Sequence, residues 1–382
     1  MAVAVICEFN PFHNGHKYLV NTSRLLTGEG VIAVMSGSFT QRGEVALTDK
    51  FTRAKTALKN GVALVVELPA VHAVANAQRF AQGGVEIAKS FSCVNYLAFG
   101  CETDDLDLLN TAAFSIYNDK VNSLIAEYMK CGDYYPRAVE NAVSKVYGDE
   151  VAQVLASPNN ILAVEYIRAL KGSGIRPLPI KRKGVAHDSS ICAGNIASAS
   201  HIRDLLRNGE SVEEFLPSVP TEITYPENLD RAILYKLRTM SAEEIKKLPD
   251  VGEGLQNRII EASRTSGSVE ELIASVKTKR YTHARLRRII TCAYLGITEN
   301  LQSQKAGYVR PLGFTQAGAE MLSACTAKVV TSAAKFLKTD ECDNEIFKKD
   351  ILATDLATLA FNEIRPCGSD FYTKIIKEFE LK

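Results

Sequence analysis

The sequence predicts a doubly wound α/β domain with a parallel sheet over residues 1–215, followed by an all-helical domain over residues 216–382. In the first region, short β-branched runs alternate with helical stretches, which is typical of a parallel sheet. At about residue 216 the composition changes, and Pro217, Pro220 and Pro226 mark a linker. The remaining chain shows helical patterns and few β-branched runs, so we expect a second, helical domain there.

The expected strands are apolar almost throughout, because helices cover both faces of a parallel sheet. They span residues 2–7, 31–35, 62–68, 96–99 and 176–180. Two of the helices between them have recognisable ends. Asp49 is expected to cap a helix that runs to Lys59, before Gly61, and Ser157-Pro158 begins another that ends near Gly172.

Composition limits the classes of protein to which the chain can belong. Of its 382 residues, 46% are hydrophobic and 23% charged, an ordinary globular balance, and the net charge is only +1. A polyanionic partner must therefore be bound by a local patch. Nine scattered cysteines without a Cys-x-x-Cys pair argue against disulfides and a structural metal site. No run approaches the ~20 apolar residues of a membrane span, so we expect a cytoplasmic protein.

The most informative motif, Cys7-Glu8-Phe9-Asn10-Pro11-Phe12-His13-Asn14-Gly15-His16, follows the first expected strand directly. In a doubly wound sheet this loop lies at the carboxyl edge, where ligands bind. Gly15 would let the backbone approach a phosphate, and the helix that begins near His16 would direct its free N–H groups at that anion. His13 and His16 could donate hydrogen bonds to phosphoryl oxygens. The alternative is two surface histidines on a turn, but the position between strand and helix favours a phosphate site.

A second motif, Ala197-Ser198-Ala199-Ser200-His201-Ile202-Arg203, follows the last expected strand. Ser200 is expected to cap a helix, and Arg203, one turn in, to reach a β- or γ-phosphate. Taken alone, this motif indicates only a capped helix with an exposed arginine. Together with the first motif, it indicates a triphosphate held between two helix N-termini.

These two motifs resemble those of the HIGH-type nucleotidyltransferase superfamily, which is related to class I aminoacyl-tRNA synthetases. The first loop more closely resembles the bacterial tRNA(Met) cytidine acetate ligase family. Further stretches resemble that family at residues 35–44, 66–69, 99–102, 157–162, 181–184, 277–282 and 308–314. The sequence departs from the family at Ser38, usually Asn, at Ser200, usually Thr, and in the short lead-in to His187-Asp188.

The resemblance implies a two-step ligase reaction. Acetate attacks the α-phosphate of ATP, which gives acetyl-adenylate and pyrophosphate. The exocyclic amine of the wobble cytidine in elongator tRNA(Met) then attacks the acetyl carbon and expels AMP. ATP is thus a substrate, no tightly bound cofactor is expected, and the magnesium dependence and oligomeric state are left open. Because a cytidine amine is conjugated into its ring and is a poor nucleophile, the acetate must be activated.

The resemblance also assigns ATP contacts to the first loop, to Gly100, to an asparagine of residues 157–162 and to the arginine of residues 181–184. Their positions suit a nucleotide, since Gly100 and Arg182 follow strand ends and Asn159 and Asn160 lie in the first turn of a helix. The two asparagines are not separated by the sequence, and Asn159 is preferred. The predicted ATP contacts are Ile6, Cys7, Glu8, Phe9, Asn10, Pro11, Phe12, His13, Asn14, Gly15, His16, Lys17, Tyr18, Leu19, Gly100, Asn159, Arg182, Ser200 and Arg203.

The predicted catalytic residues are His13 and His16. Either could stabilise the developing charge, or one could later take the proton of the amine, because imidazole titrates near neutrality. Lys50 and Arg53, on one face of the second helix, could help to bind phosphate or could form a solvated face.

The helical half carries a basic run that no acid interrupts, interleaved with Tyr281 and His283. In a chain of net charge +1, this density of cations indicates a polyanion footprint, although a solvated helix face is the alternative. Upstream, residues 248–255 resemble a turn whose backbone could lie on a phosphate. The predicted tRNA contacts are Lys277, Lys279, Arg280, Arg285, Arg287 and Arg288.

Two other functions compete with the ligase. A small-molecule adenylyltransferase of the same superfamily would need no RNA and no basic helical half. A non-catalytic RNA-binding module with a vestigial nucleotide site is disfavoured, because His13, His16, Ser200 and Arg203 are all present.

Overall fold

The computed structural model describes residues 1–182, 194–252, 254–339 and 344–379. Its centre is a seven-stranded sheet with the strand order β5-β4-β1-β2-β3-β7-β9. The first five strands are parallel, which confirms the predicted α/β fold, and each differs from its predicted span by at most two residues at either end. These strands are β1 (Ala2–Cys7), β2 (Gly30–Ser36), β3 (Val62–Leu68), β4 (Val94–Cys101) and β5 (Arg176–Lys181).

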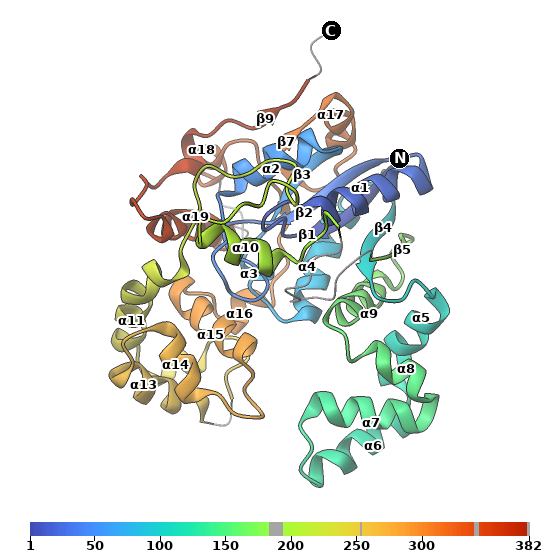
Figure 1. The fold of residues 1–382 in the computed structure, drawn as a ribbon, viewed down its shortest axis with the longest axis vertical. Coiled ribbons are helices and arrows are strands. Elements are labelled where there is room, and N and C mark those ends of the chain that lie inside the picture. The colour runs from blue at the N-terminus through green and yellow to red at the C-terminus, as the bar shows by residue number, and fades with distance from the viewer. Residues whose placement is uncertain (183–193, 253, 340–343, 380–382) are drawn as a thin grey trace.

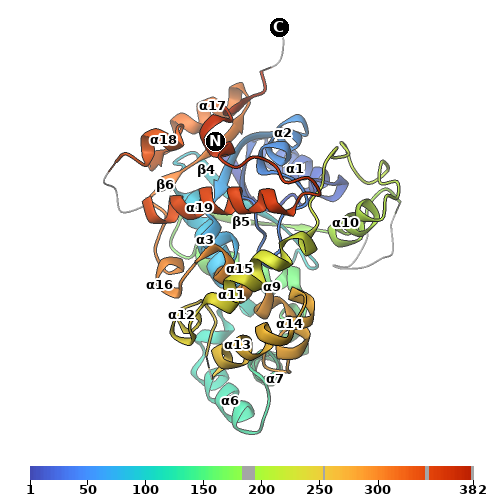
Figure 2. The same cartoon turned by 90° about the vertical axis from the view of Figure 1, so that its left-hand side faces the viewer.

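Helices cover both faces of the sheet (Figure 1). Because side chains alternate along a strand, Val3 and Val5 pack towards α1 (Asn14–Thr27) and α2 (Lys50–Lys59), whereas Ala4 and Ile6 pack towards α4 (Ala77–Lys89) and α9 (Pro158–Leu170). A lobe of four helices follows β4 and packs against α9. These helices are α5 (Leu106–Phe114), α6 (Asp119–Lys130), α7 (Tyr135–Tyr147) and α8 (Asp149–Val154). Figures 1 and 2 show α6 and α7 at one end of the molecule.

A helical unit with its own apolar core follows the linker. Its core also includes Phe39 and Val45 from the loop after β2, and Val71 and Val74 from α3 (Ala70–Ala73) and its end, so the unit packs on the loops that leave β2 and β3. Figure 2 shows these helices on the same side of the sheet region as α6 and α7. The unit comprises α11 (Asp230–Thr239), α12 (Ala242–Lys246), α13 (Leu255–Thr265), α14 (Val269–Val276), α15 (His283–Leu295) and α16 (Glu299–Gln302).

The last part of the chain departs from the predicted all-helical region, because it returns to the sheet. Strand β7 (Pro311–Phe314) pairs antiparallel with β3, and β9 (Ile376–Lys377) extends the edge. Both strands are short, and Pro311 and Gly313 favour a turn in a sequence pattern, so the sequence did not reveal them. The other elements here are β6 (Tyr308–Val309), β8 (Lys328–Val329), α17 (Gln316–Ser323), α18 (Ala333–Phe336), α19 (Asn344–Ala357) and α20 (Ser369–Tyr372).

The predicted helix ends are mostly correct. Asp49 caps α2, where its Oδ1 accepts a hydrogen bond from the Thr52 N–H at 2.9 Å. Ser157 occupies the N-cap position of α9 but makes no side-chain cap bond. The N-cap residue of α10 (Ala199–Arg207) is Ser198 and not the predicted Ser200, because the helix begins at Ala199. The Oγ of Ser198 accepts a hydrogen bond from the His201 N–H at 3.2 Å. Throughout the described ranges, the helices are too short or too polar to cross a membrane.

Candidate active site

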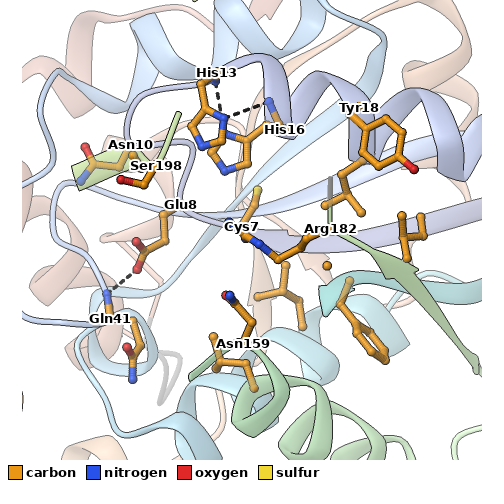
Figure 3. A pocket seen from close by; sticks show the side chains of 18 of the residues that line it. Cys7, Glu8, Asn10, His13, His16, Tyr18, Gln41, Asn159, Arg182 and Ser198 are labelled. Carbon is orange, nitrogen blue, oxygen red and sulfur yellow. Dashed lines mark hydrogen bonds between the residues drawn. The ribbon is translucent and has the colours of Figure 1, made fainter. Parts of the chain in front are cut away.

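A cavity of about 250 Å³ opens at the carboxyl ends of β1, β4 and β5. The N-termini of α1, α9 and α10 border it, as expected for the ligand edge of a doubly wound sheet. Figure 3 shows His13 and His16 at one side of the cavity, with Asn159 on the opposite side and Arg182 between them.

The two histidines lie against each other at the start of α1, with ring centroids 3.8 Å apart. Nδ1 of His13 accepts a hydrogen bond from the Gly15 N–H at 3.0 Å, and Nδ1 of His16 accepts from the His13 N–H at 3.3 Å. A neutral imidazole that accepts at Nδ1 carries its proton on Nε2. Each ring is therefore set to donate a hydrogen bond from Nε2.

Burial keeps both rings neutral. Desolvation, together with the nearby Arg182 and Arg203, lowers the pKa of His13 to about 3. The pKa of His16 is also well below its ordinary value, because of burial and then the neighbouring His13. At neutral pH, the pair is thus two hydrogen-bond donors without net charge, which could contact an anion next to Arg182 and Arg203.

The residues around the histidines explain the sequence of the loop. Phe9 and Phe12 are buried and pack on the ring of His16, with centroid distances of 5.1 and 5.8 Å. A Cβ at Gly15 would lie 2.8 Å from Cε1 of His13, so a larger residue would displace that ring. The glycine is therefore required by His13, in addition to any approach of a phosphate.

Among the described residues, four cationic side chains line the cavity: Arg42, Lys181, Arg182 and Arg203. Arg182, after β5, lies 3.9 Å from Oε1 of Glu102, and its Nε is buried without a hydrogen-bond partner among the described residues. Arg203, on α10, donates to the Asn10 carbonyl at 3.0 Å and contacts Oε2 of Glu44 at 3.4 Å. The side chains of Arg182 and Arg203 both line the cavity, so they could bind a polyanion there.

The structure separates the two candidate asparagines. Asn159 lines the cavity and donates to Oε1 of Glu102 at 2.7 Å. Asn160 is buried, and its Oδ1 accepts from the Glu102 N–H at 2.9 Å. Gly100 also lines the cavity, but it lies inside β4 rather than after it.

Most of the predicted ATP contacts meet at this cavity, although they come from distant parts of the sequence. Those that line it are Ile6, Cys7, Glu8, Asn10, His13, Gly15, His16, Tyr18, Leu19, Gly100, Asn159, Arg182, Ser200 and Arg203. Those that do not are Phe9, Pro11, Phe12, Asn14 and Lys17. Of these, the two phenylalanines belong to the core, the Asn14 side chain donates to the carbonyls of Asn195 and Glu214, and Lys17 is exposed.

Several lining residues were missed by the sequence reasoning. Gln41 and Arg42 come from the loop after β2, within residues 35–44, whose sequence indicates only a family resemblance. Phe80, Phe99, Leu162 and Tyr166 form an apolar wall between α4, β4 and α9. In the sequence these apolar residues follow the pattern of core positions, so nothing distinguishes them from ordinary core residues.

Lys50 and Arg53 neither line this cavity nor form a solvated face, since both are fully buried. Lys50 pairs with Glu67 at 2.8 Å and with Asp370 at 2.9 Å. Arg53 donates to the carbonyls of Thr48, Glu8, Ser36 and Gly37, and so ties the loops after β1 and β2 together. Both interpretations of these residues are therefore wrong, because partners from distant segments surround them.

The basic run divides into an exposed and an internally paired part. Lys277, Lys279 and Arg280 are exposed. Arg287 forms an ion pair with Glu270, Arg288 lies 3.8 Å from Oδ2 of Asp250, and their side chains are only 14% and 15% exposed. Arg285 donates to the Asp250 carbonyl at 2.7 Å. The last three arginines thus hold the helical unit together, and the exposed cations of the run are the first three. Of the other predicted stretches, Lys183, Gly184, His187, Asp188 and Glu253 lie outside the described residues.

The sequence is similar to one protein family and to curated ligases along nearly its whole length. Residues 1–369 match the model of the HIGH Nucleotidyl Transferase family. A tRNA(Met) cytidine acetate ligase of Thermoanaerobacter sp. (strain X514) is 38% identical, over 98% of this chain and 99% of that protein. The tRNA(Met) cytidine acetate ligase of Acetivibrio thermocellus is 35% identical over the same shares.

Solved structures resemble the fold along its whole length. The apo crystal structure of Thermotoga maritima TmcAL has a TM-score of 0.91 and 32% identity, and covers 99% of each chain. The structure of the same protein bound with alpha-thio ATP has a TM-score of 0.88 at the same identity and coverage.

Proposed function

The chain belongs to the HIGH nucleotidyltransferase family and, within it, to the family of the tRNA(Met) cytidine acetate ligases, and we propose that it is itself such a ligase. It uses ATP to activate acetate and transfers the acetyl group to the exocyclic amine of a cytidine in tRNA(Met). One observation carries the proposal for this chain. A single cavity gathers two neutral histidine donors, the side chains of Arg182 and Arg203, and the N-termini of α1 and α10.

In the first step, the triphosphate of ATP lies between α1 and α10. Nε2–H of His13 and of His16 donates to phosphoryl oxygens, and these bonds strengthen as negative charge develops when acetate attacks the α-phosphate. Arg182 and Arg203 bind the pyrophosphate that leaves. Because these donors are held by Gly15, Phe9 and Phe12 before ATP arrives, little reorganisation is needed during the reaction.

The nucleoside occupies the opposite end of the cavity. There, Asn159 offers an amide to the adenine or ribose, and Gly100 leaves room against the strand. The TmcAL structure with alpha-thio ATP supports nucleotide binding by a protein of this fold. In our proposal ATP is a consumed substrate, and acetate enters as its co-substrate.

In the second step, the helical unit presents the tRNA. The exposed cations Lys277, Lys279 and Arg280 bind its backbone, by charge neutralisation of phosphates. The unit is close to the cavity, because the Thr291 hydroxyl donates to the Gly43 carbonyl at 2.6 Å in the loop that also provides Gln41 and Arg42. We place the reaction in the cytoplasm, and the seven free cysteines of the described residues support a reducing compartment.

The decisive experiment is mass analysis of nucleosides from tRNA(Met) incubated with the protein, ATP and isotopically labelled acetate. We expect labelled N4-acetylcytidine, together with AMP and pyrophosphate. Reactions without ATP, without magnesium, and with acetyl-coenzyme A in place of acetate serve as controls. Acetylation from acetyl-coenzyme A alone would refute the ligase. Adenylation of a small phosphorylated metabolite without acetylated tRNA would favour the adenylyltransferase instead.

A further inference from the structure

Glu8 supplies the one carboxylate among the described residues that line the cavity. It follows β1 directly, and Figure 3 shows it between Ser198 and Gln41, with its carboxylate turned towards Gln41. Its Oε1 accepts a hydrogen bond from the Gln41 N–H at 2.7 Å. Its second oxygen, Oε2, has no hydrogen-bond partner within the described part of the chain. One oxygen thus fixes the carboxylate, and the other is available to a ligand.

Other groups at the cavity are poorly suited to take a proton. Nδ1 of His13 and Nδ1 of His16 are occupied as acceptors, so Nε2 of each ring already carries a hydrogen. The Cys7 thiol donates to the Val34 carbonyl at 3.7 Å, and burial raises its pKa well above the ordinary value. The cationic side chains that line the cavity are donors only.

We propose that Glu8 is the general base of acetyl transfer and accepts the proton of the cytidine amine. This inference rests on the proposed function, and names a residue for its second step. The amine nitrogen attacks the acetyl carbon of acetyl-adenylate, and a C–N bond forms. The C–O bond to the phosphate breaks, and AMP leaves with the electron pair. One proton of the amine passes to Oε2 of Glu8 and is then released to solvent.

The surroundings of Glu8 suit this role. Burial raises the pKa of its carboxyl group above the ordinary value, which makes the carboxylate a stronger base. The charged groups that act on it are Arg203 from α10, Arg53 from α2 and Glu44 from the loop after β2. The two arginines favour its ionised form, so it remains available as a base.

Glu8→Gln tests the proposal, because the amide oxygen can still accept from the Gln41 N–H, but the side chain cannot take a proton. Pyrophosphate release with ATP and acetate measures the first step. Single-turnover transfer of labelled acetyl to tRNA(Met) measures the second. We expect transfer to slow by about 10²-fold or more, with pyrophosphate release within a few-fold of wild type. Glu8→Asp, which keeps a carboxylate, should recover part of the transfer rate.

The pH dependence of transfer gives a second readout. In the wild-type protein, transfer should rise with pH through the pKa of Glu8 and then level off, whereas in Glu8→Gln this rise should be absent. Glu44→Gln removes a neighbouring carboxylate that does not line the cavity and that raises the pKa of Glu8. The rise of transfer with pH should therefore persist in this variant and move to lower pH. The proposal is overturned if Glu8→Gln transfers acetyl at the wild-type rate. It is also overturned if both steps fall equally, since Glu8 would then only position the Gln41 loop. If the wild-type protein makes no acetylcytidine, the proposed function itself has failed.

Discussion

Replacing His16 with Ala removes one donor from the histidine pair without touching the arginines or the nucleoside end of the cavity. The change deletes the Nε2–H that is expected to contact the α-phosphate in the transition state. It also deletes Nδ1, the acceptor of the His13 N–H at 3.3 Å, and the ring that Phe9 and Phe12 contact. A catalytic effect must therefore be separated from a structural one.

Two magnitudes can be worked out. Loss of one preorganised donor to a developing oxyanion typically slows the chemical step by about 10²–10³-fold, or roughly 2.7–4 kcal/mol. Loss of a side chain that satisfies an N-terminal N–H of a helix costs about 1 kcal/mol of stability. A protein of this size tolerates the second loss, so His16→Ala should remain folded.

The assay is pyrophosphate release with ATP and acetate, alongside thermal unfolding. His16→Gln is the matched control, because glutamine at this helix position can accept from the His13 N–H and its amide can still donate. It should regain the stability and part of the rate. The wild-type rate should show no titration near pH 6.5, since the pKa of His13 lies at about 3. A folded His16→Ala protein with nearly normal turnover would show that the ring serves packing alone.

Three further predictions concern other parts of the molecule. Gly100→Ala should raise the KM for ATP about 10-fold with unchanged thermal stability, because the added Cβ would lie in the cavity at an ordinary 3.5 Å from the nearest side-chain carbon. Lys277→Ala with Lys279→Ala should weaken tRNA binding and flatten its salt dependence by about one unit per contact, measured by filter binding. Burial lowers the pKa of His72 to about 4, so the unfolded chain takes up a proton that the folded chain excludes between pH 6.5 and 4. Stability should therefore fall with acidification over that range, and His72 should contribute up to about 1.4 kcal/mol per pH unit to the fall. His72→Leu should lose this contribution, as followed by urea unfolding.

The sequence predicted the parts of the fold that local pattern determines. Each predicted strand is a run of apolar residues long enough to cross a sheet, and the cap at Asp49 is set by residues within one turn of it. The choice between Ser198 and Ser200 was wrong, because two serines separated by one residue offer nearly the same local signal. Strands β7 and β9 were missed, because their pairing with β3 and with each other joins segments far apart in the sequence.

The candidate site was predicted where a polar motif follows a strand, and missed where apolar residues line the cavity. His13, Arg182 and Arg203 were found because strand ends of a parallel sheet meet at one edge. The basic run was misjudged in part for a related reason. Its partners Glu270 and Asp250 lie outside the run, so an acid-free stretch of sequence is not an acid-free surface.

A buried carboxylate that stabilises the fold has hydrogen-bond or ion-pair partners on both oxygens, whereas one that binds a ligand has an oxygen without such a partner. The sequence does not reveal how many partners a carboxylate has. Glu67 and Glu8 are both glutamates near strand ends. Both oxygens of Glu67 accept from Lys50, at 2.8 and 2.9 Å, and Oε2 also lies 3.3 Å from Arg310. Glu8 leaves Oε2 unpaired among the described residues. If the charge of Glu67 is removed, the buried cations Lys50 and Arg310 each lose an anionic partner. Breaking a buried ion pair in this way lowers the free energy of unfolding by roughly 3–5 kcal/mol.

The two carboxylates should therefore respond differently to the same substitution. Glu67→Gln should lower the thermal unfolding temperature strongly, whereas Glu8→Gln should leave it nearly unchanged and impair acetyl transfer. Differential scanning calorimetry of the two variants beside the wild type measures this contrast. Equal loss of stability in both variants would mean that Glu8, like Glu67, is held by the fold on both oxygens and has none free for a substrate.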